Sequence, residues 1–282
     1  MNIQMAINEG SKILKKNNIE TSILDSELLI SKVIHQDRGQ IIINPEINLK
    51  NNQFLEFKQL ITERSKGKPI AYLIGKKDFW KYEFEIKDGI LIPRPDTEII
   101  VEETLKLTKN KSKLKVLDIG VGSGCILLSI LKERKNFSGI GIDVSKNCID
   151  LCRINTNKLG IKSRVKFFKS NIDNFDYGKY DLIISNPPYI NKLDLKYLEK
   201  DIKNFEPKLA LDGGFDGTSE IRKIIKKSSE LIKNGGKLIL EIAYNQKKEV
   251  KQLLRKNSFY INSVAKDLAN NDRCIISTKI KE

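Results

Sequence analysis

The chain has 282 residues, a formal net charge of +15 at pH 7 and 40% hydrophobic residues. This length predicts a larger domain with a smaller accessory one, and no apolar run approaches the roughly 20 residues that a membrane-spanning helix needs. The positive charge suits a partner that is itself bound to RNA. Lysines are spread along the whole chain, however, so a solvated basic surface explains the charge equally well.

Residues 1–70 are expected to form a small helical bundle. From residue 3 to about residue 65, apolar positions return at three- and four-residue steps, as at Ile23, Leu24, Leu28, Leu29 and Val33. Between residues 66 and 92 the pattern changes to the aromatic and alternating positions that are typical of strands, as at Phe79, Trp80, Tyr82 and Phe84. We therefore expect a β-hairpin linker over residues 71–92.

Residues 93–282 are expected to form an α/β domain with a Rossmann-like, seven-stranded sheet. The proline and acidic residues of segment 93–98 suit the start of a helix that continues through residues 99–107. From residue 115 onward, short apolar strands alternate with helical stretches, which is the pattern of a doubly wound sheet. Strands are predicted near residues 115–119, 139–143, 165–168, 180–185, 237–242, 260–264 and 273–277.

A glycine-rich loop follows the first of these strands, with the sequence Asp118-Ile119-Gly120-Val121-Gly122-Ser123-Gly124. Glycines at such a place let a ligand approach the backbone closely. A nicotinamide dinucleotide would favour GxGxxG spacing, whereas GxGxG suits a ligand without phosphates. We predict that Gly120, Val121, Gly122, Ser123 and Gly124 bind the cofactor.

Three residues after later strands extend the predicted cofactor site. Asp143 ends the second strand, where its carboxylate can accept both hydroxyls of a ribose. Asn171 and Ile172 follow the third strand, where a polar group can meet the edge of an adenine and an aliphatic group its face. An asparagine after a strand is also ordinary turn chemistry, so this pair is the weaker signal.

The motif Asn186-Pro187-Pro188-Tyr189 ends the fourth strand, at the edge where open α/β sheets bind ligands. An amide nitrogen is a poor nucleophile because its lone pair is delocalised, so a site must orient it and accept its hydrogens. We predict that the Asn186 side-chain oxygen and the Pro187 carbonyl do so, while Pro188 stiffens the loop and Tyr189 lines the substrate pocket. We predict that Asn186 also contributes to cofactor binding. The features together predict an S-adenosylmethionine-dependent methyltransferase that acts on a planar nitrogen.

The N-terminal residues and the cysteines indicate the cellular compartment of the protein. Residues 1–7 lack the features of a secretory signal, so we expect a cytoplasmic protein. Cys125, Cys148, Cys152 and Cys274 show no metal-ligand spacing, and we expect buried thiols and no metal site.

These motifs resemble the HemK-type (PrmC) release factor glutamine methyltransferases over nearly the whole chain. Further segments are similar to that family, namely Gly67-Lys68-Pro69-Ile70-Ala71-Tyr72, Leu91-Ile92-Pro93-Arg94-Pro95-Asp96-Thr97-Glu98, Glu206-Pro207-Lys208-Leu209-Ala210-Leu211-Asp212-Gly213-Gly214 and Leu240-Glu241-Ile242. This sequence departs from the family at Asp96, where glutamate is more frequent, at Asn171, where aspartate is usual, and at Ala243, where glycine is commoner.

The resemblance implies a helical N-terminal substrate-docking domain and a catalytic sheet whose last strand is antiparallel. It also implies methyl transfer to the glutamine amide of the Gly-Gly-Gln motif in class-1 peptide-chain release factors, with S-adenosylhomocysteine as the other product. We expect a monomer that forms no stable nucleic-acid complex.

Two other readings remain open from the residues. A nucleic-acid methyltransferase acting on adenine N6 or cytosine N4 faces the same chemical problem and uses similar loops. No target-recognition domain or DNA-binding motif is evident in the sequence, which argues against it. An inactive binding module that keeps the fold is the second reading, and the intact loop, Asp143 and proline motif argue against it.

Overall fold

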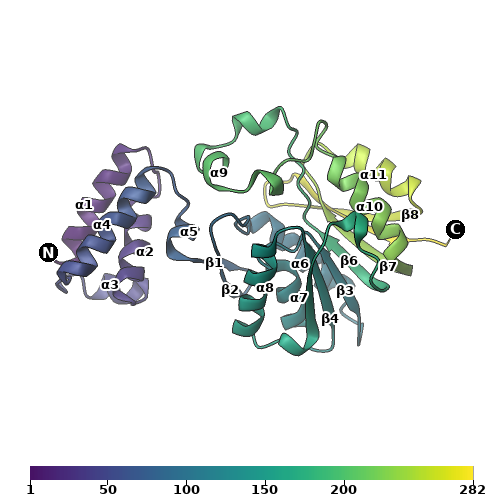
Figure 1. Cartoon of the computed structure of the whole chain (residues 1–282), viewed down its shortest axis with the longest axis horizontal. Coiled ribbons are helices and arrows are strands. Elements are labelled where there is room, and N and C mark those ends of the chain that lie inside the picture. The colour runs from purple at the N-terminus through teal and green to yellow at the C-terminus, as the bar shows by residue number, and fades with distance from the viewer. Residues whose placement is uncertain (282) are drawn as a thin grey trace. The chain divides into compact units, whose positions relative to one another are not determined.

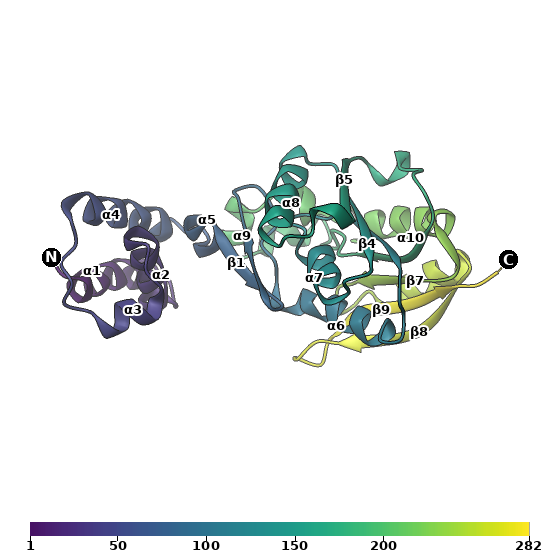
Figure 2. The same ribbon diagram turned by 90° about the horizontal axis from the view of Figure 1, so that it is seen from below.

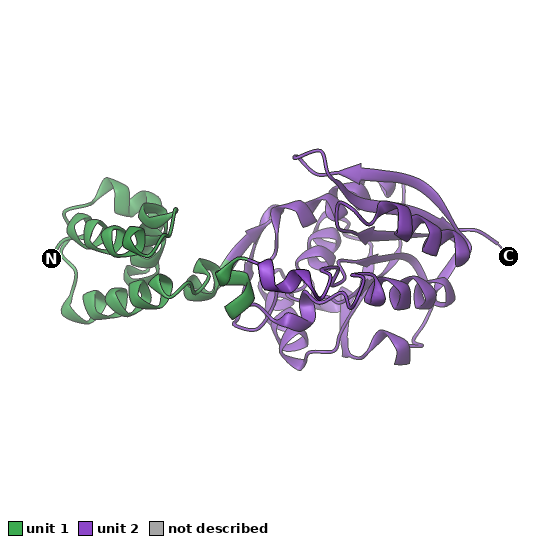
Figure 3. Cartoon of the chain, turned by 90° about the horizontal axis from the view of Figure 1, so that it is seen from above, with its two compact units in different colours: residues 1–76, 199–205 green, residues 77–198, 206–282 purple. Residues whose placement is uncertain are grey.

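The computed structural model describes residues 1–281. These residues divide into two compact units, one made of residues 1–76 and 199–205, the other of residues 77–198 and the chain from residue 206 onward (Figure 3). Within the described part of the chain, no helix is both long and apolar enough to span a membrane.

The first unit is a helical bundle, as the apolar periodicity predicted. Helices α1, α2 and α4 pack side by side around a core that includes Ile3, Leu29 and Phe57 (Figure 1). The Asn2 side chain caps α1 by accepting a hydrogen bond from the Met5 amide over 2.9 Å. The helices of this unit's N-terminal part are α1 (Ile3–Lys16), α2 (Ser22–Ile34), α3 (Arg38–Ile43), α4 (Asn51–Ser65) and α5 (Ile70–Ile74).

A buried ion-pair network ties a distant segment into this unit. Arg64 in α4 donates from Nε to Asp25 in α2 over 2.7 Å and from a terminal guanidinium nitrogen to Asp201 over 2.9 Å. Asp201 lies in α9 (Lys200–Phe205), which the chain reaches only after the fourth strand of the large sheet. The Arg64 side chain is 9% exposed, so its charge depends on these two carboxylates.

The two-stranded hairpin is shorter than the predicted linker. It comprises β1 (Lys76–Phe79) and β2 (Tyr82–Glu85), whereas residues 70–74 form α5 and residues 86–92 are not strand. The aromatic residues Phe79 and Phe84 are buried and pack edge to face with ring centroids 6.2 Å apart. They therefore join the core of the second unit, to which all of the hairpin except Lys76 belongs.

The second unit contains a seven-stranded sheet with the order β5-β4-β3-β6-β7-β9-β8. All pairs from β5 to β7 are parallel, and β9 is antiparallel to both of its neighbours, which confirms the predicted fold class. The strands are β3 (Lys115–Ile119), β4 (Ser138–Asp143), β5 (Val165–Lys169), β6 (Tyr180–Ser185), β7 (Ile232–Glu241), β8 (Phe259–Lys266) and β9 (Asp272–Lys279).

Helices cover both faces of this sheet. Residues of α6, α7 and α8 share one apolar cluster with one face, and residues of α10 and α11 share another with the opposite face (Figures 1 and 2). The helices are α6 (Glu98–Leu107), α7 (Cys125–Glu133), α8 (Lys146–Lys158), α10 (Ser219–Leu231) and α11 (Lys247–Lys256). Short 3₁₀ turns occur at η1 (Pro95–Thr97), η2 (Lys162–Arg164), η3 (Ile172–Asn174), η4 (Asp194–Tyr197) and η5 (Lys208–Ala210).

The strand order reverses between β3 and β6. From β3 the chain proceeds to β4 and β5 on one side, and it then returns to β6 on the other. In an open α/β sheet, such a switch point opens a crevice at the carboxyl ends of the strands. The glycine loop follows β3 and the proline motif follows β6, so both lie at this crevice.

Candidate active site

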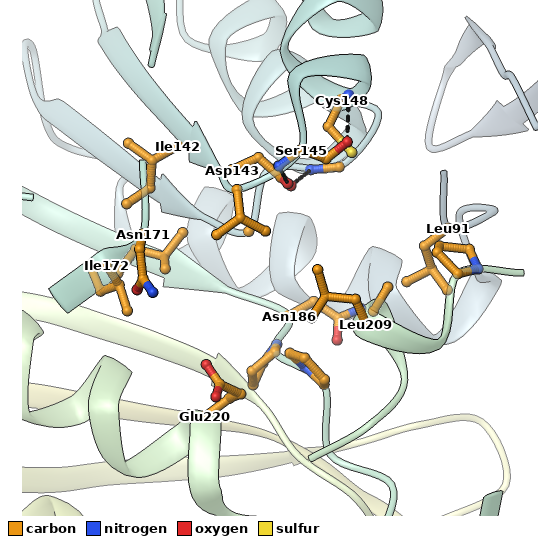
Figure 4. Close-up of a pocket in the computed structure, with 18 of the residues that line it drawn as sticks. Leu91, Ile142, Asp143, Ser145, Cys148, Asn171, Ile172, Asn186, Leu209 and Glu220 are labelled. Atoms are coloured by element: carbon orange, nitrogen blue, oxygen red, sulfur yellow. Dashed lines mark hydrogen bonds between the residues drawn. The ribbon is translucent and has the colours of Figure 1, made fainter. Parts of the chain in front are cut away.

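A cavity of about 390 Å³ opens at the switch point, a size suited to a nucleoside-like small molecule (Figure 4). Most of its lining is apolar, as at Ile119, Ile142 and Ile172. The predicted site residues that line it are Gly120, Gly122, Asp143, Asn171, Ile172, Asn186, Pro187 and Pro188. Val121, Ser123, Gly124 and Tyr189 are not among the lining residues.

The glycine loop presents bare backbone to this cavity. Gly120 and Gly122 have φ angles of +74° and +54°, and a Cβ added to either would meet no atom within 4 Å. The buried Asn155 of α8 steadies the loop, because its side-chain amide donates to the Ser123 carbonyl over 2.9 Å. The loop thus combines a strained conformation that favours glycine with open space for a ligand.

Asp143 is held at the carboxyl end of β4 by backbone donors. Its Oδ2 accepts from the Gly122 amide over 3.0 Å and its Oδ1 from the Ser145 amide over 2.8 Å (Figure 4). Burial raises the pKa of this carboxyl, and the two amides partly oppose that change. Each oxygen retains a lone pair, so the carboxylate can accept two further hydrogen bonds from a ligand.

Asn171 and Ile172 border the cavity after β5 (Figure 4). The Asn171 side-chain oxygen accepts from the Asp173 amide over 3.1 Å, which leaves its amide nitrogen free of that turn. Ile172 is buried and contributes an aliphatic surface.

The proline motif divides between two environments. Asn186, Pro187 and Pro188 line the cavity, whereas the Tyr189 hydroxyl lies 3.4 Å from Glu241 Oε1. The Asn186 side-chain nitrogen donates to Thr97 Oγ1 over 3.1 Å, so the opposite end of the amide presents its oxygen elsewhere. Burial, with the Glu241 charge, raises the pKa of Tyr189 well above that of free tyrosine, so its hydroxyl stays protonated.

Asp118 precedes the glycine loop as a buried carboxyl, and among residues 1–281 neither of its oxygens has a hydrogen-bond partner of normal geometry. Burial raises its pKa to about 8, an effect that the nearby Leu127 amide reduces and the Asp143 charge increases. Asp118 is not among the residues that line the cavity, and a carboxyl with this pKa is mainly protonated at neutral pH. It therefore adds no negative charge to the cavity lining.

Other residues of the site were given no role by the sequence analysis, although Thr97, Leu91 and Leu209 lie in segments that resemble the family. Thr97 and Asn155 act on the two motifs from 89 and 32 positions away respectively. Further cavity residues come from separate loops and from α10, among them Leu91, Leu209, Glu220 and Lys223. Lys223 is paired with Glu220 over 2.7 Å, so it is not a free cation that would call for a phosphate.

Two sequence families match this chain. The family described as the PrmC N-terminal domain matches residues 5–75, and a family described as a methyltransferase domain matches residues 110–279. These ranges fall on the helical bundle and on the large sheet.

Solved structures share the fold of the larger unit. A ribosomal protein L11 methylase from Lactobacillus delbrueckii subsp. bulgaricus is 18% identical with a TM-score of 0.52, over 70% of this chain and 84% of that one. A methyltransferase from Pyrococcus furiosus is 20% identical with a TM-score of 0.53, over 70% of this chain and 89% of that one.

Curated relatives match over nearly the full length. Release factor glutamine methyltransferases are 39% identical in Buchnera aphidicola subsp. Acyrthosiphon pisum, over 99% of both chains, and 38% identical in Clostridium botulinum, over 96% of this chain and 97% of that one. The relative of the same name from Fusobacterium nucleatum is 37% identical, over 96% of this chain and 77% of its own. The chain therefore belongs to the release factor glutamine methyltransferase family, which confirms the resemblance seen in its motifs.

Proposed function

We propose that this protein transfers a methyl group from S-adenosylmethionine to the side-chain amide nitrogen of the glutamine in the Gly-Gly-Gln motif of class-1 peptide-chain release factors. The observation that carries the proposal is the Asn186 side chain, whose nitrogen is engaged by Thr97 and whose oxygen is left to accept a hydrogen from a substrate amide. Family membership supports the choice of a protein glutamine over a nucleic-acid base.

The cavity residues fit the proposed cofactor. Asp143 would accept the ribose hydroxyls, and Asn171 and Ile172 would meet the adenine. Gly120 and Gly122 would let the amino acid portion of the cofactor lie against the backbone. When bound, S-adenosylmethionine supplies an activated methyl group on a positively charged sulfur.

The Asn186 and Pro187 oxygens would act on the substrate nitrogen. Each would accept one amide N–H, which orients the nitrogen toward the methyl group. These hydrogen bonds strengthen as the nitrogen becomes positive, so they stabilise the transition state more than the bound substrate. The nitrogen would gain the methyl group as the bond between that group and the cofactor sulfur breaks, which leaves S-adenosylhomocysteine, and it would lose one proton to water.

The helical unit, which lies outside the cavity lining, would serve as the docking domain for the release factor. The match of residues 5–75 to the PrmC N-terminal domain supports this assignment. The proposed enzyme is a monomer and forms no stable complex with nucleic acid.

A labelled-methyl assay tests the proposal by offering a class-1 release factor and duplex DNA in separate reactions. The release factor should take up label, and a substrate variant with glutamate in place of the Gly-Gly-Gln glutamine should not. Label in the DNA, or undiminished label in the glutamate variant, would overturn the assignment.

A further inference from the structure

The strand register brings a buried carboxyl next to the proline motif. Ser185 of β6 pairs with Leu240 of β7, so the following residues, Asn186 and Glu241, leave neighbouring strands at the same level. Thr97 reaches the same place from η1. Thr97 and Glu241 belong to segments of the family resemblance; the proposed chemistry uses Thr97 only as the acceptor for the Asn186 nitrogen and gives Glu241 no role.

Hydrogen bonds already connect part of this cluster. Asn186 Nδ2 donates to Thr97 Oγ1 over 3.1 Å, and Thr97 is 3% exposed. The Tyr189 hydroxyl lies 3.4 Å from Glu241 Oε1. Glu241 Oε2 is buried and has no hydrogen-bond partner of normal geometry within residues 1–281.

The hydroxyl of Thr97 and the free oxygen of Glu241 complement each other. Because the Thr97 oxygen receives a hydrogen from Asn186, its own proton needs another acceptor in a buried setting. Burial raises the pKa of Glu241 to about 7, and the nearby Thr97 hydroxyl is the first influence that opposes this rise. Glu241 Oε2 is thus the nearby oxygen that can accept the proton of the Thr97 hydroxyl.

We propose that Thr97 is a positioning residue that fixes the orientation of the Asn186 amide through a one-way relay, Asn186 N–H to Thr97 and Thr97 O–H to Glu241. This inference rests on the proposed function. A carboxylate can only accept, so Thr97 must donate to it and can only accept from Asn186. The relay therefore holds the Asn186 nitrogen away from the substrate amide, which also needs an acceptor. If the Asn186 side-chain amide were turned round, its N–H groups would face the N–H groups of the substrate amide, and neither could accept a hydrogen bond.

Protonation of Glu241 would remove the constraint on the direction of these hydrogen bonds, because a carboxylic acid can donate to Thr97. The groups that face Glu241 are the Tyr189 hydroxyl, the Arg273 guanidinium and the Asp96 carboxylate, besides Thr97. Arg273 favours the ionised form and Asp96 opposes it. Turnover should therefore fall on the acid side, as pH decreases through the pKa of Glu241.

Thr97→Val and Thr97→Ser test the relay in the full chain. Valine keeps the shape but removes the hydroxyl, and we expect kcat to fall about 10- to 100-fold with little change in the cofactor Kd. Serine keeps the hydroxyl and should stay within about threefold of the native kcat. The matched control is Thr104→Val, because Thr104 is a buried α6 residue whose hydroxyl has no hydrogen-bond partner of normal geometry in the described part of the chain.

Glu241→Gln tests the direction of the relay. A glutamine carries both an acceptor and a donor, so the direction of the Thr97 hydroxyl is no longer fixed; kcat should fall by less than in Thr97→Val, and the acid limb of the pH profile should disappear. Native activity from Thr97→Val, or an equal loss in Thr97→Ser and Thr97→Val, would overturn the proposal, because the hydroxyl would then have no special role.

A second measurement needs no substrate and separates this inference from the proposed function. The side-chain amide protons of Asn186 should exchange slowly with solvent in the cofactor-free protein, as read by nuclear magnetic resonance, and quickly in Thr97→Val. Equal exchange in both proteins would overturn the relay even if the release factor is methylated. If the exchange differs as expected but no release factor is methylated, the proposed function fails and the relay stands.

Discussion

Asn186 and Asp143 illustrate what single residues contribute to this site. Asp143 is the last residue of β4 and Asn186 directly follows β6, so the sequence alone placed them at one edge of the sheet. Their roles differ, since Asp143 is fixed by two backbone amides and Asn186 by one hydroxyl. Thr97 could not be found in this way, because 89 positions separate it from Asn186 and only the folded chain brings them together.

Asn186→Ala should abolish most methyl transfer while leaving the cofactor site intact. Loss of one acceptor that stabilises the transition state costs about 100- to 1000-fold in kcat. The cofactor Kd should change much less than kcat, because the contacts from Asp143 and the glycine loop are untouched. Steady-state kinetics and calorimetry provide the two readings, with Asn257→Ala, at the C-cap of α11, as the control. Full turnover in Asn186→Ala would remove this residue from the chemistry.

Asp143→Asn should weaken cofactor binding about 10- to 100-fold, the usual range for losing charge-assisted hydrogen bonds. The amide nitrogen of asparagine cannot accept from the Gly122 or the Ser145 N–H, so the loop loses one of its anchors as well. Titration calorimetry measures the effect. The control is Asp150→Asn, an exposed α8 residue paired with Arg153, and similar affinities for both variants would contradict the assignment.

At the scale of elements, the sequence predicted the sheet better than the connections. Strands in a parallel sheet are buried on both faces, so β3, β4 and β6 appear as short apolar runs. β7 begins at Ile232, earlier than predicted, because its first residues include Lys233, Asn234 and Gly235, which carry no apolar signal. Helix α9 has six residues and no buried one, so nothing in its pattern indicated that it belongs with the helical bundle.

Arg64→Met should destabilise the helical unit by about 3–5 kcal/mol, because Asp25 would remain buried without its cation. The double variant Asp25→Asn with Arg64→Met should regain part of that loss. Denaturant unfolding followed by circular dichroism measures both, and Lys66→Met, exposed beyond the end of α4, is the control. A stability of Arg64→Met equal to that of the control would show that the network contributes little.

At the scale of the whole molecule, two buried carboxyls link stability to pH. The pKa of Glu241 is raised by burial from 4.5 to about 7 and that of Asp118 from 3.8 to about 8. The folded protein therefore binds these protons more tightly than the unfolded chain, and their contribution is fully present below about pH 4. It is lost as pH rises from there to about 7 or 8.

The free energy of unfolding of the cofactor-free protein should accordingly decline between pH 5 and 8.5, by a few kcal/mol. Asp118→Asn should flatten this slope, as measured by urea unfolding at several pH values. The control variant is Asp216→Asn. The hydrogen bond from Arg222 lowers the pKa of Asp216, so this residue titrates below the pH window and its replacement should leave the slope unchanged. If the free energy of unfolding of Asp118→Asn depended on pH as strongly as that of the native protein, the raised pKa of Asp118 would be contradicted.

The central claim concerns the acceptor of the methyl group. Mass spectrometry of release-factor peptides from cells with and without this protein measures it directly. The account predicts one methyl group on the glutamine of the Gly-Gly-Gln peptide in the first sample and its absence in the second. The same methylation in both samples would contradict it.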